Sequence, residues 1–315
     1  MVQTYGIAYA ITACLIWGLI FIVPQFMIGF SFIEIALGRY FFYGVVSGFV
    51  LLKTRWERPG RYSLAIWGQA MLFSMTSTFL YYTCLILALR YATPAVCALL
   101  LGLCPITSSV YGAWRERERH FRHLILPSLL ILIGLVMINV PYLSQSAMPS
   151  SYILGLMFCL VSLACWSWYV VANIHFLKAH PEIASSDWST LVGVATLVWT
   201  AIFGTVLVWM ADPNDLVKYT VWTPALGRYL IGSAVLGFFC SWLGAFLWNR
   251  ASLRLPVSLA GQLTIFETIF GALYVYLLDW RFPPLVECCG ILLFLIAITF
   301  GIRQSGSKTE VVMDS

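Results

Sequence analysis

One acidic residue stands near the middle of a long apolar stretch, where a charge is hard to accommodate. Residues 254–278 read RLPVSLAGQLTIFETIFGALYVYLL, and Glu267 is the single acid among them. At ~1.5 Å per residue, a helix of this length crosses the ~30 Å hydrocarbon layer and places Glu267 near the bilayer midplane. A charge there costs on the order of 2.5–3.5 kcal/mol on insertion scales. We therefore expect Glu267 to couple a proton or to balance a cationic substrate. The structural alternatives are a neutral acid hydrogen-bonded inside the bundle and an ion pair with Arg39.

Arg39 is the matching base, seven residues into the apolar segment 32–52. Its long side chain can extend toward the membrane surface, where Glu34 is the expected partner. Two interpretations stay open for Arg39: a structural ion pair or external gate, and a binding group for a substrate carboxylate. The planar guanidinium suits the second role because it can hold a carboxylate with two hydrogen bonds.

A proline and several hydroxyl residues mark a second candidate region. Pro105 removes a backbone hydrogen bond within the segment 92–114, and Ser108 follows it by one helical turn. Thr264 stands one helical turn before Glu267 and gives that helix a narrow polar edge. A kinked, hydroxyl-rich helix can line a cavity, and a simple packing kink is the alternative.

Aromatic residues supply the remaining candidates. Trp17 and Trp166 fall in the middle of apolar segments, away from the interfacial positions that tryptophan usually takes. Tyr82 is a further candidate in the third segment. Aromatic walls around a cavity would suit an apolar, aromatic or quaternary-ammonium substrate, the last through cation–π contact.

These residues are carried by a chain with the composition of a membrane protein. Of its 315 residues, 61% are hydrophobic and 10% are charged, against about 25% charged residues in soluble domains. The net charge of +5 comes mainly from loops and does not indicate a nucleic-acid partner. The sequence contains no GxxxxGK[ST] or HExxH motif, and its cysteines and histidines do not have the spacing of metal ligands. We expect neither a metal nor a cofactor, and no enzymatic activity.

Ten apolar segments are long enough to cross a bilayer, and we number them as spans 1 to 10. Their approximate limits are 5–26, 32–52, 64–88, 92–114, 124–143, 152–177, 189–211, 225–248, 254–278 and 284–302. Thirteen of the 18 lysines and arginines lie in the loops and tail on the side of the two termini, and four lie on the opposite side. The positive-inside rule then predicts that both termini are cytoplasmic.

The two halves of the chain resemble each other. GIAYAITACLIWG from Gly6 aligns with GLMFCLVSLACWS from Gly155, so that Trp17 meets Trp166. The stretch from Ala88 likewise resembles the stretch from Ala251. A five-span repeat inserts its two copies in opposite orientations, which places a substrate site near the midplane between them. We predict an all-α integral membrane fold of ten helices: a first repeat over 1–143, a second over 150–303, and a disordered cytoplasmic tail over 304–315.

Several motifs make the chain similar to a known family. They are IWG at 16–18, LGRY at 37–40, LALRYATPA at 87–95 followed by Pro105, and the acidic turn with Glu116 and Glu118. With these motifs, the chain resembles the EamA-type ten-span carriers of the drug/metabolite transporter superfamily. The resemblance implies secondary transport of a small metabolite by alternating access. One departure is that Glu267 stands where the second repeat of this family usually carries a proline like Pro105.

The main hypothesis is a carrier of the inner (cytoplasmic) membrane that exports a small metabolite, such as an amino acid, with proton exchange at Glu267. An importer of choline-like quaternary ammonium compounds is the second hypothesis. A non-transporting membrane enzyme or assembly factor is the third. The expected partners are a small-molecule substrate, the lipid bilayer and coupled protons, and the chain is expected to act as a monomer or homodimer.

Overall fold

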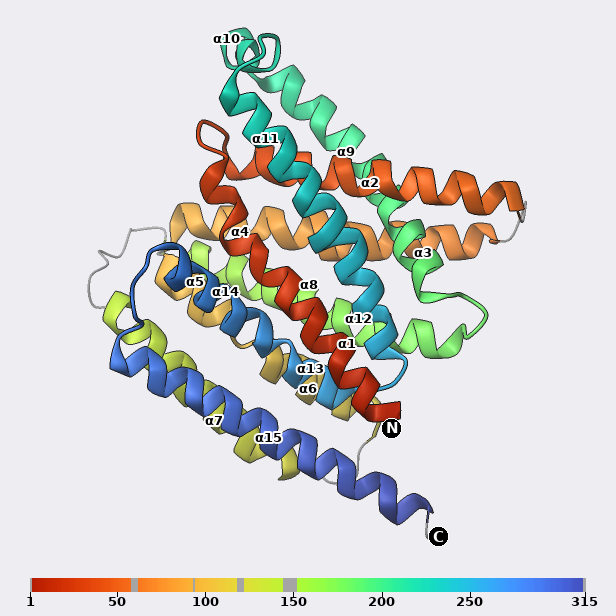
Figure 1. The fold of residues 1–315 in the computed structure, drawn as a ribbon, viewed down its shortest axis with the longest axis vertical. Helices are drawn as coiled ribbons and strands as arrows, with labels where there is room; N and C mark the ends of the chain where they lie inside the picture. Colours follow the sequence, from red (N-terminus) through yellow and green to blue (C-terminus); the bar gives the residue numbers. More distant parts are fainter. Residues whose placement is uncertain (1, 58–61, 93, 118–121, 144–151, 314–315) are drawn as a thin grey trace.

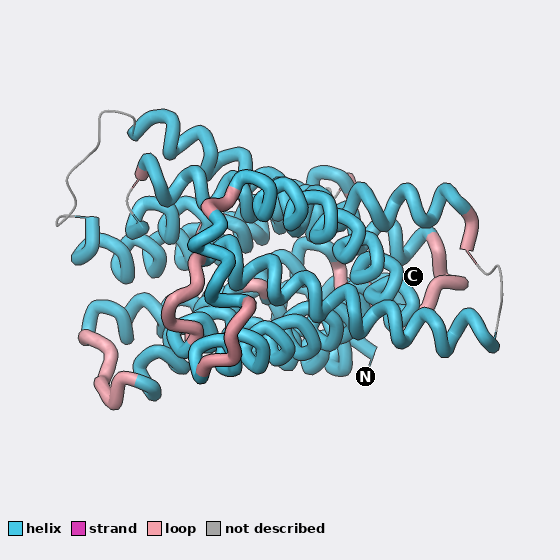
Figure 2. The backbone as a smooth tube through the Cα atoms, turned by 90° about the horizontal axis from the view of Figure 1, so that it is seen from above, coloured by secondary structure: helices cyan, strands magenta, loops and turns pink. Residues whose placement is uncertain are grey.

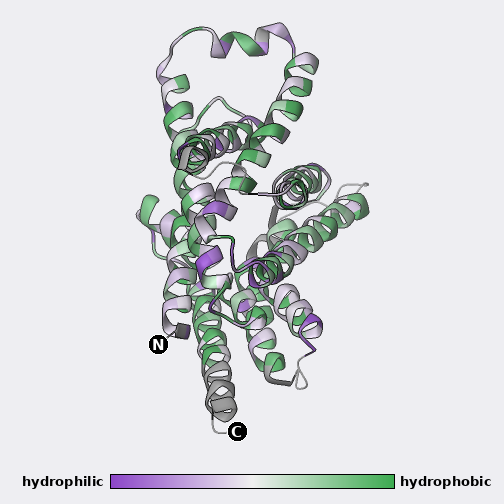
Figure 3. Ribbon diagram, turned by 90° about the vertical axis from the view of Figure 1, so that its right-hand side faces the viewer, coloured by the Kyte–Doolittle hydropathy of each residue, from purple (hydrophilic) through white to green (hydrophobic). Residues whose placement is uncertain are grey.

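The fold is a bundle of helices, seen in a computed structural model of the whole chain (Figure 1). The structure describes residues 2–57, 62–92, 94–117, 122–143 and 152–313. Within these ranges the regular structure is entirely helical (Figure 2). Hydrophobic residues recur in the helices that Figure 3 colours by hydropathy.

The helices confirm the ten predicted spans. Among the described residues, nine helical segments are long and apolar enough to cross a membrane, and the apolar stretch Leu124–Asn139 is shorter. The first five spans are α1 (Val2–Trp17) continued by η1 (Gly18–Phe21) and η2 (Val23–Phe26), α2 (Phe32–Glu57), α3 to α4 (Leu64–Ser74 and Tyr81–Tyr91), α5 and α6 (Pro94–Leu101 and Cys104–Arg115), and α7 (Arg122–Leu143). The last five are α8 (Tyr152–Ala179), α9 (Ser185–Met210), α11 to α12 (Pro224–Val235 and Gly244–Ser252), α13 and α14 (Val257–Leu263 and Ile265–Leu278), and α15 (Leu285–Met313). The short helices α10 (Pro213–Leu216) and η4 (Val217–Tyr219) join spans 7 and 8.

The same irregularities occur in corresponding spans of the two halves. Spans 3 and 8 each begin after a hydroxyl cap, in which Ser63 accepts from the Ile66 amide and Thr223 from the Leu226 amide. Each of these spans then contains a π-helical segment, η3 (Met75–Leu80) and η5 (Leu236–Leu243). Spans 4 and 9 are each broken into two helices. π-Helical segments often mark functional sites, since they interrupt the regular backbone hydrogen bonding.

The packing of the spans has the same twofold character. Span 2 packs on span 7, span 4 on span 9, and span 5 on span 10. Span 1 contacts spans 8 and 9, and span 6 makes the corresponding contacts with spans 3 and 4. Gly6 packs on Arg254 and Leu255, and its predicted counterpart Gly155 packs on Tyr91 and Ala92. A side chain at either glycine would collide with this neighbour. These matched contacts support the repeat interpretation, while the boundaries 1–143 and 150–303 stay a prediction.

Both ends of the chain lie at the same end of the bundle (Figures 1 and 2). We call this end the terminal face and the other end the opposite face. Helix α15 continues to Met313, so residues 304–313 are helical where the sequence predicted a disordered tail. This segment contains no proline, and its single glycine does not end the helix. Helices α7 and α15 pack side by side at the edge of the bundle (Figure 1).

Candidate transport site

Glu267 lies next to a break in span 9, not in the middle of a continuous helix. Helix α13 ends at Leu263 and α14 begins at Ile265, so the prediction of one unbroken helix over 254–278 is wrong. Thr264 forms the junction, where its hydroxyl donates to the Gly261 carbonyl at 2.7 Å. Glu267 therefore occupies the first turn of α14. The helix dipole favours a carboxylate at this position.

The Glu267 side chain is placed where both halves of the bundle meet. Its carboxylate is close enough for electrostatic interaction with side chains from five other spans: Cys14 in span 1, Arg39 in span 2, Tyr81 in span 3, Cys104 in span 4 and Cys240 in span 8. Glu267 nevertheless keeps part of its surface accessible, as do Arg39 and Tyr81. Glu267, Arg39 and Tyr81 are thus each enclosed by several spans without being fully buried.

The Glu267 carboxylate has no hydrogen bond or ion pair to any described residue. This distinguishes it from the alternatives of a hydrogen-bonded neutral acid and a contact ion pair with Arg39. Buried charges in proteins are normally paired, since an unpaired charge in an apolar medium is costly. The unpaired position of Glu267 leaves its carboxylate free to take a proton or a cationic group of a ligand.

Arg39 is held by the π-helical segment of span 8. Its Nε donates to the Ser241 hydroxyl at 2.8 Å, and a terminal nitrogen donates to the Cys240 carbonyl at 3.4 Å. Arg39 and Glu267 interact electrostatically without forming a contact pair, which leaves a positive and a negative group apart in the same region. Opposite charges in this arrangement suit a zwitterionic ligand placed between them.

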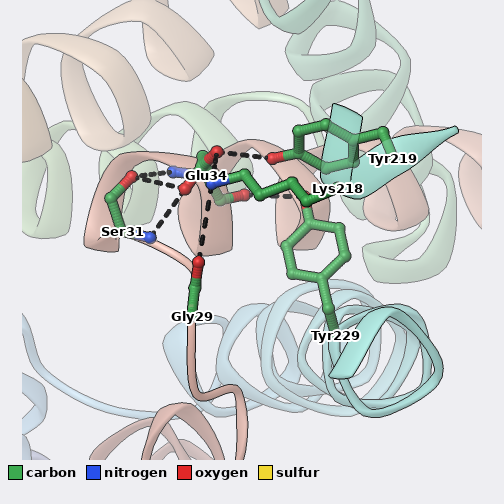
Figure 4. A network of polar contacts seen from close by, with 6 residues as sticks. All are labelled: Gly29, Ser31, Glu34, Lys218, Tyr219 and Tyr229. Atoms are coloured by element: carbon green, nitrogen blue, oxygen red, sulfur yellow. Dashed lines mark hydrogen bonds and ion pairs between the residues drawn. The ribbon is translucent and has the colours of Figure 1, made fainter. Parts of the chain in front are cut away.

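The predicted pairing of Arg39 with Glu34 is wrong. Glu34 forms an ion pair with Lys218 at 2.7 Å and accepts a hydrogen bond from the Tyr219 hydroxyl at 2.7 Å (Figure 4). It also accepts from the backbone amide and the hydroxyl of Ser31. We call these four residues the Glu34 network. It connects the loop before α2 with the segment before α11 on the opposite face, which the sequence could not indicate because the partners are about 185 residues apart.

The aromatic candidates Trp17 and Trp166 do come together. Their rings lie 6.4 Å apart, edge to face, and Trp166 also packs on Tyr81 at 5.2 Å and Tyr169 at 5.4 Å. Trp17 is buried, with its ring 5.4 Å from that of Trp248. Through Tyr81 this aromatic cluster lies within electrostatic reach of Glu267. It can thus supply an apolar, cation-attracting wall beside the acid.

The hydroxyl candidates lie in packed contacts. Ser108 is fully buried and donates to the Cys104 carbonyl of its own helix, while Pro105 begins the helical half after the break in span 4. Ser109 binds the Ser258 carbonyl at 2.9 Å and thereby joins α6 to α13. Tyr82 donates to the Phe32 carbonyl at 3.0 Å, near the opposite face. These residues fix the broken helices in place, and their roles as lining residues stay predictions.

The structure adds residues that the sequence did not single out. Ser241 and the Cys240 carbonyl hold Arg39, and Cys14 donates from Sγ to the Leu263 carbonyl at the break, at 3.5 Å. No local sequence signal marks them, because a π-helical segment has the same hydropathy as an α-helix. No group of histidine, cysteine and acidic residues suited to a metal ion occurs among the described residues.

The fold and site define a class: multi-pass helical membrane proteins whose two halves pack as inverted repeats around a central acid. Residues 4–140 match the model of the EamA-like transporter family. Inner membrane protein YtfF of Escherichia coli (strain K12) is 28% identical over 322 residues, covering 98% of this chain and 99% of that protein. A solved crystal structure has the same fold, with a TM-score of 0.76 at 17% identity, covering 96% of this chain and 98% of that one. Residues 4–140 thus resemble the EamA-like transporter family, and the chain over nearly its whole length is similar in sequence to YtfF.

Proposed function

We propose that this protein is a secondary transporter of the inner membrane that exports a small amphipathic metabolite in exchange for protons. The observation that carries the proposal is the unpaired Glu267 carboxylate at the meeting point of the two halves. A mid-membrane acid with accessible surface can bind a proton at one step of the transport cycle and release it when the substrate binds. The relative YtfF is described as an inner membrane protein, which supports the same location for this chain.

The arrangement of charges favours an amino acid or a similar zwitterion. Arg39 is available to the carboxylate end and Glu267 to the ammonium end, with the Trp17–Trp166–Tyr81 cluster beside the apolar part. Arg39 can take the carboxylate-binding role because its two hydrogen bonds to span 8 leave other N–H groups of the guanidinium available to a ligand.

The test is a comparison of two modes of transport in proteoliposomes. The purified chain is reconstituted and supplied with radiolabelled leucine, phenylalanine and threonine in turn. For a transported amino acid, we expect a pH gradient to drive its accumulation in the wild type. In Glu267→Gln, the gradient-driven accumulation is lost while exchange of labelled for unlabelled substrate continues, because the amide binds no proton. Glu182→Gln, an exposed loop acid on the terminal face, is the matched control and behaves as wild type. Full gradient-driven accumulation by Glu267→Gln would disprove the coupling role.

The aromatic cluster beside Glu267 supports a second candidate function, import of a choline-like quaternary ammonium compound. Tryptophan and tyrosine faces attract such cations, and Glu267 would act as the counter-ion. Transport of labelled choline by this route follows the membrane potential and is insensitive to a pH gradient. Potential-driven choline uptake that Glu267→Gln abolishes would favour the importer over the exporter.

A further inference from the structure

The terminal face contains a pocket that lies apart from Glu267. It has a volume of about 670 Å³ and is formed between α3 and the C-terminal half of α8, with Arg115 from the end of α6. Its aromatic walls include Phe73, Trp168 and Phe176, and Arg115 and His175 are among its polar lining residues. A volume of this size lies within the range of small-molecule sites.

The inverted repeat shows that this pocket is more than a packing defect. Its counterpart on the opposite face would lie between α11 and the end of span 1. There Met27 is buried, with 1% of its surface exposed, and its Sδ packs so close to Gly232 that a side chain at Gly232 would collide with it. The bundle is therefore closed at this position on the opposite face and hollow at the equivalent position on the terminal face. This asymmetry is what an entrance open to one side requires.

Aromatic contacts connect the pocket with the candidate transport site. Phe73 lines the pocket and contacts Trp168 at 5.4 Å and Tyr169 at 6.1 Å between ring centroids. Tyr169 in turn contacts Trp166, the central ring of the aromatic cluster. The pocket thus adjoins the aromatic cluster through packed aromatic rings.

The ionisable groups of the pocket are basic. Arg115 is exposed and has no hydrogen bond or ion pair to a described residue. The Nε2 atom of His175 is buried without a hydrogen-bond partner. No acid is among the lining residues, and the nearby Glu116 already pairs with Lys178 at 3.5 Å. An unpaired guanidinium beside an unpaired imidazole nitrogen, between aromatic walls, has the chemistry to bind a carboxylate that carries an apolar body.

We propose that this pocket is an entrance site that binds amphipathic carboxylates before they reach Glu267, with Arg115 and His175 holding the carboxylate and Phe73, Trp168 and Phe176 the apolar part. The inference rests on the proposed transport function and specifies its substrate class. It places a first recognition of the carboxylate at the pocket, before the ligand reaches Arg39 and Glu267, so the pocket and the proton-coupling site can be tested separately.

The experiment measures binding of three ligands that share a phenyl group and differ in charge. The purified full chain, in phosphatidylcholine nanodiscs, is titrated calorimetrically with 3-phenylpropionate, 3-phenylpropionamide and 3-phenylpropylamine. We expect 3-phenylpropionate to bind at least tenfold more tightly than the amide, and the amine to bind most weakly. Arg115→Gln removes the preference for the acid over the amide. Lys53→Gln, an exposed lysine at the same end that does not line the pocket, keeps it.

His175→Leu is the second variant and weakens 3-phenylpropionate while leaving the amide nearly unchanged. Loss of gradient-driven accumulation in Glu267→Gln and loss of the preference for the acid in Arg115→Gln are separate results, so failure of proton coupling and failure of carboxylate binding at the pocket can be distinguished. Equal affinities for the acid and the amide in the wild type would overturn the proposal. So would a preference that persists in both Arg115→Gln and His175→Leu. If the preference for 3-phenylpropionate over the amide disappears in phosphatidylglycerol nanodiscs, the basic groups bind anionic lipid headgroups, and this result would also overturn the proposal.

Discussion

At the scale of single residues, Glu34 shows how one acid can organise a whole surface. Its carboxylate accepts hydrogen bonds from Ser31 and Tyr219 and pairs with Lys218, so it caps α2 and fixes the segment before α11 at once (Figure 4). Burial, and in addition the hydrogen bond to Glu34, raises the pKa of Tyr219 above its ordinary value. The Tyr219 hydroxyl therefore remains protonated, and a donor to the ionised Glu34, at neutral pH.

This arrangement predicts that substitution of Glu34 destabilises the protein more than substitution of Lys218 does. The side chains of Lys218 and Glu34 are 34% and 23% exposed, so the pair alone contributes less than about 1 kcal/mol. Lys218→Met should lower the melting temperature of the detergent-purified protein by no more than a few degrees. Glu34→Ala removes the cap of α2 and the partner of Tyr219 as well, and should cost about 1–3 kcal/mol. A larger loss for Lys218→Met than for Glu34→Ala would show that the ion pair, not the network, stabilises this face.

At the scale of elements, close helix packing at Gly155 makes a second prediction. A Cβ atom at this position would lie 2.6 Å from the Ala92 backbone nitrogen, which cannot move without shifting the loop between spans 3 and 4. Gly155→Ala should destabilise the protein by about 1–3 kcal/mol. Gly204→Ala in α9 meets no atom within 4 Å and should be neutral or stabilising by up to about 1 kcal/mol. Thermal unfolding of the two variants in the same detergent distinguishes them, and equal melting temperatures would contradict the predicted contact.

The elements also show which features the sequence could reveal. The matched positions Gly6 and Gly155, and Trp17 and Trp166, follow from the internal repeat, and the break beside Pro105 follows from proline chemistry. The break at Thr264 could not be predicted, because TIFET contains no helix breaker and reads as a continuous helix. Hydropathy finds the spans, since apolar length is a local property. The partners of Arg39 and Glu34 depend on the rotation and packing of distant helices, and no local pattern records these.

At the scale of the whole molecule, the direction of transport depends on how the bundle sits in the membrane. The pocket opens on the terminal face, and the corresponding position on the opposite face is closed by Met27. Thirteen basic residues in the loops and tail of the terminal face predict that this face is cytoplasmic. The entrance would then collect its ligand from the cytoplasm, which is the arrangement that an exporter needs.

Two single cysteines on opposite faces test this orientation. Val221, 57% exposed, lies between η4 and α11 on the opposite face, and Glu182 is exposed in the loop between α8 and α9 on the terminal face. In a background with Cys288 and Cys289 replaced by serine, a membrane-impermeant maleimide should label Val221→Cys in intact spheroplasts. Glu182→Cys should react only after permeabilisation. The reverse pattern would place the termini outside and make the pocket an entrance for import. The choline-like importer would then become the stronger interpretation of Glu267 and its aromatic neighbours, because a pocket facing outward collects ligands from the periplasm.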